Sequence, residues 1–429
     1  MTTATSEAAA DMLRRHSLGD PDVLENPTAY HHALHARPIH YDARLGFYVC
    51  STYHLMRRIL RDTETFSSVD SQTVDSLREP PPEVVALRRR SWAPVNTLVT
   101  NDPPSHTRFR RMVDAPFRPR SIDRLRAAIR GIVENTVDGF VACGRCEVVR
   151  ELAIPIPINV IADMLGLERS LAPRIKAWSD ASVEPLGMKV SDERLIECAR
   201  LIKEFQDFIG AELDARRKAP RDDLLTSLVT ARDDAGEGFS MPEMLSLTQQ
   251  FLVAGNETTT NAIAAGVQLL VENPDQAAHL AGHLDDRTLR RFANEVLRLE
   301  SPTQGLFRVV RQDVSIGGVD IPAGARIMLR FAAANRDPEQ YPDPDRLDLA
   351  RDNAGTHLAF GAGIHHCIGA NLAREELVQT FDVLLRRARR FEFVPERNDF
   401  SHHPSMILRG LKALHVRFEP LDHATEELP

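Results

Sequence analysis

The chain has 429 residues, 43% hydrophobic and 27% charged, a composition that is typical of globular proteins and excludes collagen-like and wholly disordered chains. Its 61 acidic and 53 basic residues give a net charge of −8, so the chain as a whole has no electrostatic case for binding nucleic acid. No apolar stretch reaches the roughly 18 residues that cross a membrane, and the start lacks the pattern of a secretory signal, so we expect a cytoplasmic protein with no membrane partner.

The N-terminal part of the chain begins with a polar stretch. Residues 1–18 show no hydrophobic period, which predicts a flexible segment. Residues 19–429 contain no repeat, linker or break in composition, so we expect them to form one large domain. Within it, residues 39–41 and 47–50 flank a glycine-containing turn and predict a β-hairpin, and Ser51 is expected to cap the helix that follows.

Two contrasting segments precede a long helix in the middle of the chain. Residues 67–104 sustain no period and predict a long irregular segment, whereas residues 121–213 carry helical patterns broken by prolines. Ser240 and Glu243 form a capping box, and apolar positions then recur with helical spacing until Asn273. About 31 residues at ~1.5 Å each give a helix of about 46 Å, long enough to cross the whole domain.

The last third of the chain combines helices with short strands. Residues 288–299 predict a helix, and residues 307–310, 314–316 and 326–331 are strand-like pieces separated by Gly and Pro turns. A glycine cluster then precedes a final helix over residues 368–387. The predicted fold class is therefore mainly α with a minor β part.

A glycine-rich segment around one cysteine carries the strongest chemical signal. Glycines crowd around Cys367, which opens the final helix, in the segment Phe360-Gly-Ala-Gly-Ile-His-His-Cys-Ile-Gly-Ala370. Peptide N–H groups and the positive dipole end of a helix lower the pKa of a thiol, so such a place favours a thiolate. Gly363 and Gly369 would let a flat, bulky group approach the backbone. The plain alternative is a buried free cysteine beside a tight turn.

The other cysteines give no sign of a disulfide framework. Five cysteines are an odd number, thinly spread over a long chain, so we expect reduced thiols. Cys143 and Cys146 form a single CxxC, and without a second pair this favours a surface turn over a zinc or redox site. His365, His366 and Cys367 are consecutive and point apart, so zinc binding is not favoured there either.

Three further motifs accompany the cysteine segment, which itself has the pattern F-x-x-G-x-H-x-C-x-G. They are Asp102-Pro-Pro-Ser-His106-Thr-Arg-Phe-Arg110, Ala254-Gly-Asn-Glu-Thr-Thr259 in the middle of the long helix, and Glu295-Val-Leu-Arg298. In their patterns, order and spacing the four motifs resemble the cytochrome P450 family of haem-thiolate monooxygenases, from about residue 35 to residue 418. The resemblance implies the family's fold, a single large domain around a long central helix.

The resemblance implies a cofactor, haem b, and a ligand for its iron. Cys367 would be the proximal axial ligand. A thiolate pushes electron density toward the iron and favours cleavage of the O–O bond on the opposite side, whereas a histidine pushes less. By position in the motifs, Phe360, Gly363, Gly369 and Ala254 would also contact the haem.

An acid and an alcohol in the long helix are implied to lie on the distal side, where bound dioxygen must receive two protons. Thr258 can bond back to the carbonyl of Ala254, four residues earlier, which with Gly255 nearby loosens the helix into a groove for oxygen and water. Glu257 would relay protons. The plain alternatives are an incidental glycine and a solvated acid.

A charged pair on the following helix is implied to be structural rather than catalytic. Glu295 and Arg298 lie three residues apart on one helix face, where an ion pair is geometrically natural. The resemblance buries this pair behind the haem and adds Arg346 as a third member of a structural lock. The family often has Phe at the position of Leu347, so the chain departs from the pattern there.

The two propionates of a haem need cationic or hydrogen-bonding partners inside a largely apolar slot. By matching positions, the resemblance implies His106, Arg110, Arg308 and His365 as these partners. His106 and Arg110 lie four residues apart on one helix face. Taken singly, each of the four has the alternative of an ordinary surface residue.

Residues 106–130 contain eight arginines against two aspartates in a chain of net negative charge. A solvated helix face is one explanation, and nucleic acid is disfavoured because only Phe109 and Phe117 interleave the charges. The resemblance implies that this stretch lies on the proximal face, where an acidic ferredoxin or flavodoxin docks with electrostatic steering that fades with salt. The chain has no room for a fused reductase, so we expect electrons from separate proteins.

The implied function is that of a monooxygenase, which inserts one atom of O2 into an organic substrate and reduces the other to water. Residues 67–99 and 181–189 with Val253, Leu306, Met406 and Ile407 would form the pocket wall. These stretches are apolar or mixed, which indicates a hydrophobic small molecule, whether terpenoid, steroid, aromatic or fatty.

Two alternative functions stay open at this point. One is a peroxygenase driven by hydrogen peroxide, against which Thr258 argues because such members commonly lack the acid and alcohol pair. The other is a haem-based sensor or carrier without turnover, and the chain shows no appended signalling segment that would favour it.

Overall fold

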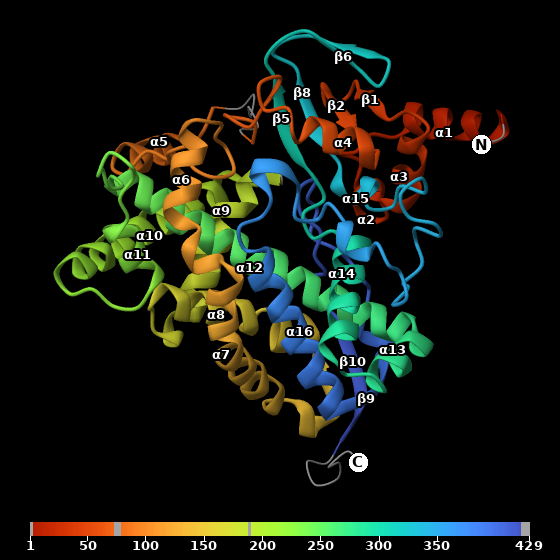
Figure 1. Cartoon of the computed structure of the whole chain (residues 1–429). Helices are drawn as coiled ribbons and strands as arrows, with labels where there is room; N and C mark the ends of the chain where they lie inside the picture. Colours follow the sequence, from red (N-terminus) through yellow and green to blue (C-terminus); the bar gives the residue numbers. More distant parts are fainter. Residues whose placement is uncertain (1–2, 73–78, 188–189, 422–429) are drawn as a thin grey trace.

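The structure is a computed structural model that describes residues 3–72, 79–187 and 190–421 (Figure 1). Helices make up most of it, and the strands form three small sheets. The mainly α fold class with a minor β part is therefore confirmed. No described helix combines the length and the apolarity that would carry it across a bilayer.

The long helix predicted in the middle of the chain is α12, Met241–Glu272, and its 32 residues begin at the predicted capping box. It is apolar on most of its circumference and is covered by α8 (Pro155–Leu165), α9 (Ala172–Gly187), α14 (Asp286–Glu300) and α16 (Ala370–Arg387). A Cβ atom on Gly266 would overlap the ring of Phe381, so glycine is what lets α16 approach α12 so closely.

The remaining helices surround this centre. Figure 1 shows α7 and α16 in front of α12, with α5, α10 and α11 at one edge. Their bounds are α1 Thr3–Arg15, α2 Pro21–Glu25, α3 Thr28–His35, α4 Tyr53–Ile59, α5 Pro82–Arg89, α6 Ser105–Val113, α7 Pro119–Asp138, α10 Asp192–Lys218, α11 Leu224–Thr230, α13 Pro274–Ala281 and α15 Phe331–Ala334.

The largest sheet has five strands in the order β1, β2, β8, β5, β3, with bounds Ile39–Asp42, Phe47–Cys50, Arg326–Leu329, Leu306–Val310 and Phe66–Ser67. The predicted hairpin is its β1–β2 pair, in which Ile39 lies opposite Cys50. A second sheet joins β4 (Arg145–Glu147), β10 (His415–Pro420) and β9 (Ala388–Phe393), and β6 (Val314–Ile316) pairs with β7 (Val319–Ile321). The predicted strands at 307–310 and 314–316 are thus confirmed.

The structure differs from the sequence predictions at three places near the N-terminus. Residues 3–15 form a helix that buries Leu13 in the core beneath the five-stranded sheet, so the segment predicted as flexible carries ordered structure. The segment 67–104 contains α5, and its residues 73–78 lie outside the described residues. Ser51 does not cap α4, because its hydroxyl donates to the carbonyl of Leu34.

Candidate functional site

Cys367 lies in the loop that enters α16, three residues before the helix begins at Ala370. Its amide donates to the carbonyl of Phe360 at 2.9 Å, which closes the loop into a tight turn. Burial raises the pKa of the Cys367 thiol, while the Gly369 amide and the guanidinium groups of Arg110 and Arg374 act in the opposite direction. In this structure burial opposes the effect that the sequence predicted for the helix start, and coordination to a metal would favour the thiolate.

The two glycines of the loop differ in what they allow. Gly363 has a φ of +69°, and a Cβ atom there would lie 2.7 Å from the carbonyl oxygen of Leu60 at the end of α4. The packing of the loop on α4 therefore requires glycine at this position, and the approach of a bulky ligand that the sequence suggested stays a prediction. A Cβ atom on Gly369 would lie 3.9 Å from the sulfur of Cys367, an ordinary contact, so its expected contact with a cofactor stays a prediction.

Two predicted histidines meet beside this loop. The rings of His106 on α6 and His365 lie 4.4 Å apart. His365 is fixed through both nitrogens, because Nδ1 lies 3.1 Å from the carbonyl oxygen of Leu98 and Nε2 lies 3.0 Å from the hydroxyl of Ser68. Burial lowers the pKa of His365 to about 3 and also lowers the pKa of His106, so burial favours the neutral form of both rings. His106 Nε2 is buried without a hydrogen-bond partner among the described residues.

Two predicted arginines lie close to these rings. Arg308 on β5 is buried, and the only hydrogen bond of its guanidinium among the described residues goes to the neighbouring carbonyl of Phe307. Burial lowers the pKa of Arg308 to about 10, although Asp102 partly offsets this effect. Arg110 on α6 donates to the carbonyl of His366 at 2.8 Å.

A buried guanidinium without a carboxylate and a buried imidazole nitrogen without a partner leave polar capacity that an anionic ligand would satisfy. Both groups lie near His365, in the loop that carries Cys367. A haem has a metal that a thiol binds and carboxylates at its edge, so these residues fit it.

The middle of α12 carries the predicted acid and alcohol. The Thr258 hydroxyl donates to the carbonyl of Ala254 at 2.9 Å, so the predicted bond back to the helix is confirmed. Ala254 is exposed, although most of α12 is buried. Glu257 forms an ion pair at 3.2 Å with Lys176 of α9, which in turn binds Asp180. Burial raises the pKa of Glu257, and Lys176 opposes that effect.

The sequence did not reveal Lys176, because it lies 81 residues before Glu257 in the chain. No motif includes it. Its burial and its two carboxylate partners became visible only when α9 was packed against α12.

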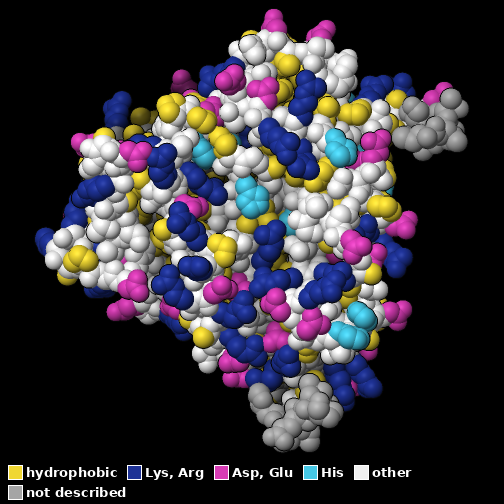
Figure 2. Space-filling view, viewed as in Figure 1, with side chains coloured by type: hydrophobic (Ala, Val, Ile, Leu, Met, Phe, Trp, Pro, Cys, Tyr) yellow, Lys and Arg dark blue, Asp and Glu magenta, His cyan; other side chains and the backbone are white. Residues whose placement is uncertain are grey.

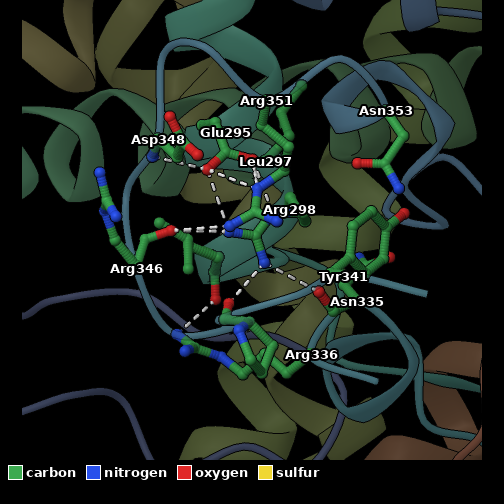
Figure 3. Close-up of polar contacts among 12 residues, drawn as sticks. Glu295, Leu297, Arg298, Asn335, Arg336, Tyr341, Arg346, Asp348, Arg351 and Asn353 are labelled. Atoms are coloured by element: carbon green, nitrogen blue, oxygen red, sulfur yellow. Dashed lines mark hydrogen bonds and ion pairs between the residues drawn. The ribbon is translucent and has the colours of Figure 1, made fainter. Parts of the chain in front are cut away.

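The predicted charged pair lies on α14, in the cluster shown in Figure 3. Glu295 and Arg298 are fully buried, and their side chains meet at 2.6 and 3.0 Å. The predicted third member was wrong. The side chain of Arg346 is exposed and points away from Glu295 in Figure 3, and only its carbonyl accepts from Arg298. Arg351 instead places its guanidinium 3.3 Å from the Glu295 carboxylate.

The arginines of residues 106–130 are largely paired within the chain. Six of the eight form ion pairs, with carboxylates that include Asp233, Glu243, Glu375 and Asp382. Arg120 and Arg124 have no carboxylate partner among the described residues. Figure 2 shows Lys and Arg side chains across the face over α6, α7 and α16, mixed with Asp and Glu. The local excess of positive charge is therefore smaller than the sequence suggested.

The four predicted pocket residues are all half-buried. A backbone hydrogen bond of 2.7 Å from Gln304 to Ile407 brings the start of β5, with Leu306, toward Met406 and Ile407. Val253 lies on α12. The stretches 67–99 and 181–189 lie partly outside the described residues, so the pocket wall stays a prediction.

Comparisons with known proteins point to one family. The family model for cytochrome P450 matches residues 188–413. The cytochrome P450 monooxygenase PikC of Streptomyces venezuelae is 36% identical over 326 residues, which is 75% of this chain and 76% of PikC. The steroid C26-monooxygenase of Mycobacterium tuberculosis is 31% identical over 88% of this chain and 96% of its own. The solved structure of CYP109Q5 from Chondromyces apiculatus superposes with a TM-score of 0.82 and 33% identity, over 94% of this chain and 98% of that one.

Proposed function

This chain belongs to the cytochrome P450 family, and we propose that it oxidises a hydrophobic small organic molecule with O2 and with electrons from a separate acidic ferredoxin or flavodoxin. Members of the family bind haem b and act as monooxygenases, and this chain has their fold. The proposal concerns the residues that do this work, the class of substrate and the electron donor.

Cys367 is the residue that would hold the haem iron, with His106, Arg110, Arg308 and His365 around the propionates. The observation that carries this assignment is that, among the described residues, the buried Arg308 has no carboxylate partner and His106 Nε2 has no hydrogen-bond partner, while both side chains lie near His365. When bound, haem b with a thiolate ligand supplies the binding of O2 and the cleavage of its O–O bond. The fixed ring of His365 keeps a neutral donor or acceptor at the propionate edge.

Thr258 and Glu257 would deliver protons on the other side. The hydroxyl of Thr258 holds its proton toward the carbonyl of Ala254, and rotation about one side-chain bond frees it to donate elsewhere. Burial raises the pKa of Glu257, a direction that favours a carboxyl group able to hold a proton and donate it. The ion pair with Lys176 limits how far burial raises the pKa of Glu257.

The substrate class is proposed from two sources. Val253, Leu306, Met406 and Ile407 are apolar side chains that are only half-buried, which suits a wall that a hydrophobic ligand would cover. The relative from Mycobacterium tuberculosis is named a steroid C26-monooxygenase, which supports a substrate of similar apolar character. Residues 19–429 would form the monooxygenase domain.

A spectroscopic experiment tests the ligand assignment. The reduced, carbon monoxide-bound protein is expected to show the strongly red-shifted Soret band of thiolate coordination. Cys367→Ser is expected to lose that band, and Cys143→Ser, which changes an exposed free cysteine, is expected to keep it. Retention of the band in Cys367→Ser would refute the assignment.

A further inference from the structure

Arg330 is a buried arginine between β8 and α15, and no carboxylate pairs with it in the part of the chain that the structure describes. Burial lowers the pKa of Arg330 to about 9, which leaves the guanidinium charged at neutral pH. A buried cation without a carboxylate is costly unless its N–H groups find other acceptors. The acceptors that Arg330 uses therefore indicate why a cation lies at this position.

The three nitrogen atoms of the guanidinium donate to three different parts of the chain. Nε donates to Nε2 of His31 on α3 at 3.0 Å, Nη1 donates to the carbonyl of Met406 at 2.7 Å, and Nη2 donates to the side-chain oxygen of Gln304 at 2.8 Å. Burial lowers the pKa of His31 well below its usual range, which favours the neutral ring that can accept this bond. A planar guanidinium fixes the directions of its bonds, so Arg330 holds the three acceptors in one arrangement.

Gln304 extends this arrangement to the next residue of the same turn. Its side-chain amide donates to two carbonyls at the end of α14, both at 2.8 Å, and its backbone amide donates to the carbonyl of Ile407 at 2.7 Å. The turn at residues 406–407 is thus fixed at two consecutive carbonyls, one bonded to Arg330 and the other to Gln304.

The start of β5 lies against the backbone of Arg330. A Cβ atom on Gly305 would lie 2.6 Å from the carbonyl oxygen of Leu329 and 3.3 Å from the Cα atom of Arg330, so a side chain there would displace the backbone. Leu306 is paired with Leu329 in the five-stranded sheet. The backbone beside Arg330 therefore sets the place of Leu306, while the side chain of Arg330 sets the place of the turn at residues 406–407.

We propose that Arg330 is a positioning residue that fixes the spacing between Leu306 and the turn at residues 406–407, two segments of the proposed pocket wall. The inference rests on the proposed function, because it states how part of that pocket keeps its shape. A ligand that lies between the two segments contacts apolar side chains whose places depend on the three bonds of one guanidinium. The loss of these bonds lets the turn move, and the wall then holds a ligand on the iron less tightly.

The experiment uses two azoles that differ by one apolar ring. Imidazole and 4-phenylimidazole both bind the iron of the ferric haem protein through a nitrogen atom and shift its Soret band, but only the second places a phenyl group in the pocket. Titration of the band gives both affinities. Their ratio measures the contacts of the phenyl group with the pocket wall, because effects on the iron itself cancel.

Two methionine variants are compared with the parent protein. Arg330→Met removes the charge and all three hydrogen bonds and keeps an unbranched side chain. Arg336→Met is the matched control on the same segment, because Arg336 donates to the carbonyl of Leu299 and to Asp345 and does not bond to the turn at residues 406–407.

Arg330→Met is expected to lower the preference for 4-phenylimidazole over imidazole about fivefold, which corresponds to about 1 kcal/mol of lost contact. Arg336→Met is expected to keep the parent ratio. An unchanged ratio in Arg330→Met, or an equal loss in both variants, would overturn the proposal. So would a parent protein that binds the two azoles equally, because its wall would then not reach a ligand on the iron.

A further variant separates positioning from a general weakening of the fold. Arg330→Met leaves three buried acceptors without their donor, so it is also expected to unfold at a lower urea concentration. Arg351→Ala breaks a buried ion pair on α14 and is expected to unfold earlier as well, but to keep the parent ratio of the two azoles. A loss of the ratio in Arg351→Ala equal to that in Arg330→Met would show that the ratio follows stability and would overturn the proposal.

Two outcomes distinguish this inference from the proposed function. If the parent protein lacks the thiolate band in its carbon monoxide complex, the proposed function fails. If the band is present and the azole ratio is insensitive to Arg330, the positioning role alone fails. Should Arg330→Met not fold, Arg330→Lys keeps the cation, but its single amine does not replace the three directed bonds of the guanidinium. It is expected to lower the ratio at least about twofold, and a ratio equal to that of the parent overturns the proposal.

Discussion

The guanidinium of Arg351 lies 3.3 Å from the carboxylate of Glu295, although the two residues are 56 positions apart in the chain. Arg298, on the same helix as Glu295, pairs with the same carboxylate, so two cations share one buried acid. Arg351 also donates to the carbonyls of Pro342 and Asp343. This side chain therefore ties the segment before the cysteine loop to α14.

Arg351→Ala is expected to destabilise the folded protein by about 3 kcal/mol, because it leaves part of a buried carboxylate without its partner. Arg346→Ala is the matched control, since its exposed side chain does not touch Glu295, and it is expected to change the stability by no more than about 0.5 kcal/mol. Urea unfolding of the haem-loaded protein measures both. A greater loss of stability in Arg346→Ala than in Arg351→Ala would instead support Arg346 as the third member of the cluster, as the sequence predicted.

Glu376 on α16 gives a pH dependence of stability. It is buried, and burial raises its pKa from 4.5 to about 8. Between these values the unfolded chain releases a proton that the folded protein keeps, so the free energy of unfolding falls as the pH rises through that window. The slope from this one group is at most about 1.4 kcal/mol per pH unit.

Glu376→Gln is expected to flatten that slope in urea unfolding between about pH 5 and about pH 8, because the amide does not titrate. Glu375→Gln is the neighbouring control. Its carboxylate is held by Arg126 and Arg290, so its loss is expected to lower stability across the range while the slope remains. A slope that survives in Glu376→Gln contradicts the assignment.

The sequence predicted the features that depend on neighbouring residues. The capping box at Ser240, the Glu295 and Arg298 pair and the bond from Thr258 to Ala254 each join residues three or four positions apart, where helix geometry fixes the contact. The hairpin at β1 and β2 likewise follows from one turn.

The features that sequence reasoning missed depend on distant partners. Arg126 reaches Glu375, 249 positions away, and nothing in a local pattern tells that this arginine is paired rather than free. The same holds for Arg351 and for Lys176. The helix α1 was missed because its apolar residues are few, and their burial against α3 and the sheet becomes evident only from the packing.

Arg308 is expected to bind the haem by pairing with the carboxylates of the haem propionates. Arg308→Gln removes the charge and keeps a polar side chain of similar reach, so the rate of haem transfer to apomyoglobin is expected to rise about tenfold, given that a charge-assisted bond contributes about 1.5 kcal/mol or more. Arg311→Gln, three residues further along and bonded to Ser67, is the control and is expected to transfer haem at nearly the parent rate. Equal rates in the two variants would argue against a propionate contact by Arg308.

Thr258→Ala is expected to uncouple the reaction. Reductant consumption should persist, while hydrogen peroxide rises and product per reductant falls roughly tenfold, because a positioned proton donor is lost. Thr260 lies on the same helix, but its hydroxyl donates to the carbonyl of Ala153. Thr260→Ala is therefore expected to keep product formation coupled to reductant consumption. Unchanged coupling in Thr258→Ala would remove the proton-delivery role.

Lys176 and Asp180 act on Glu257 with opposite signs, which allows a paired test of its role. Lys176 lowers the pKa of Glu257 and Asp180 raises it. Lys176→Met is therefore expected to raise the pKa of Glu257 further, so that Glu257 stays protonated to higher pH. The pH above which product per reductant declines is then expected to shift upward. Asp180→Asn lowers the pKa of Glu257 and is expected to shift the same pH downward. Product formed per reductant consumed, measured across pH, gives both shifts, and shifts of the same sign in the two variants would mean that another group controls the profile.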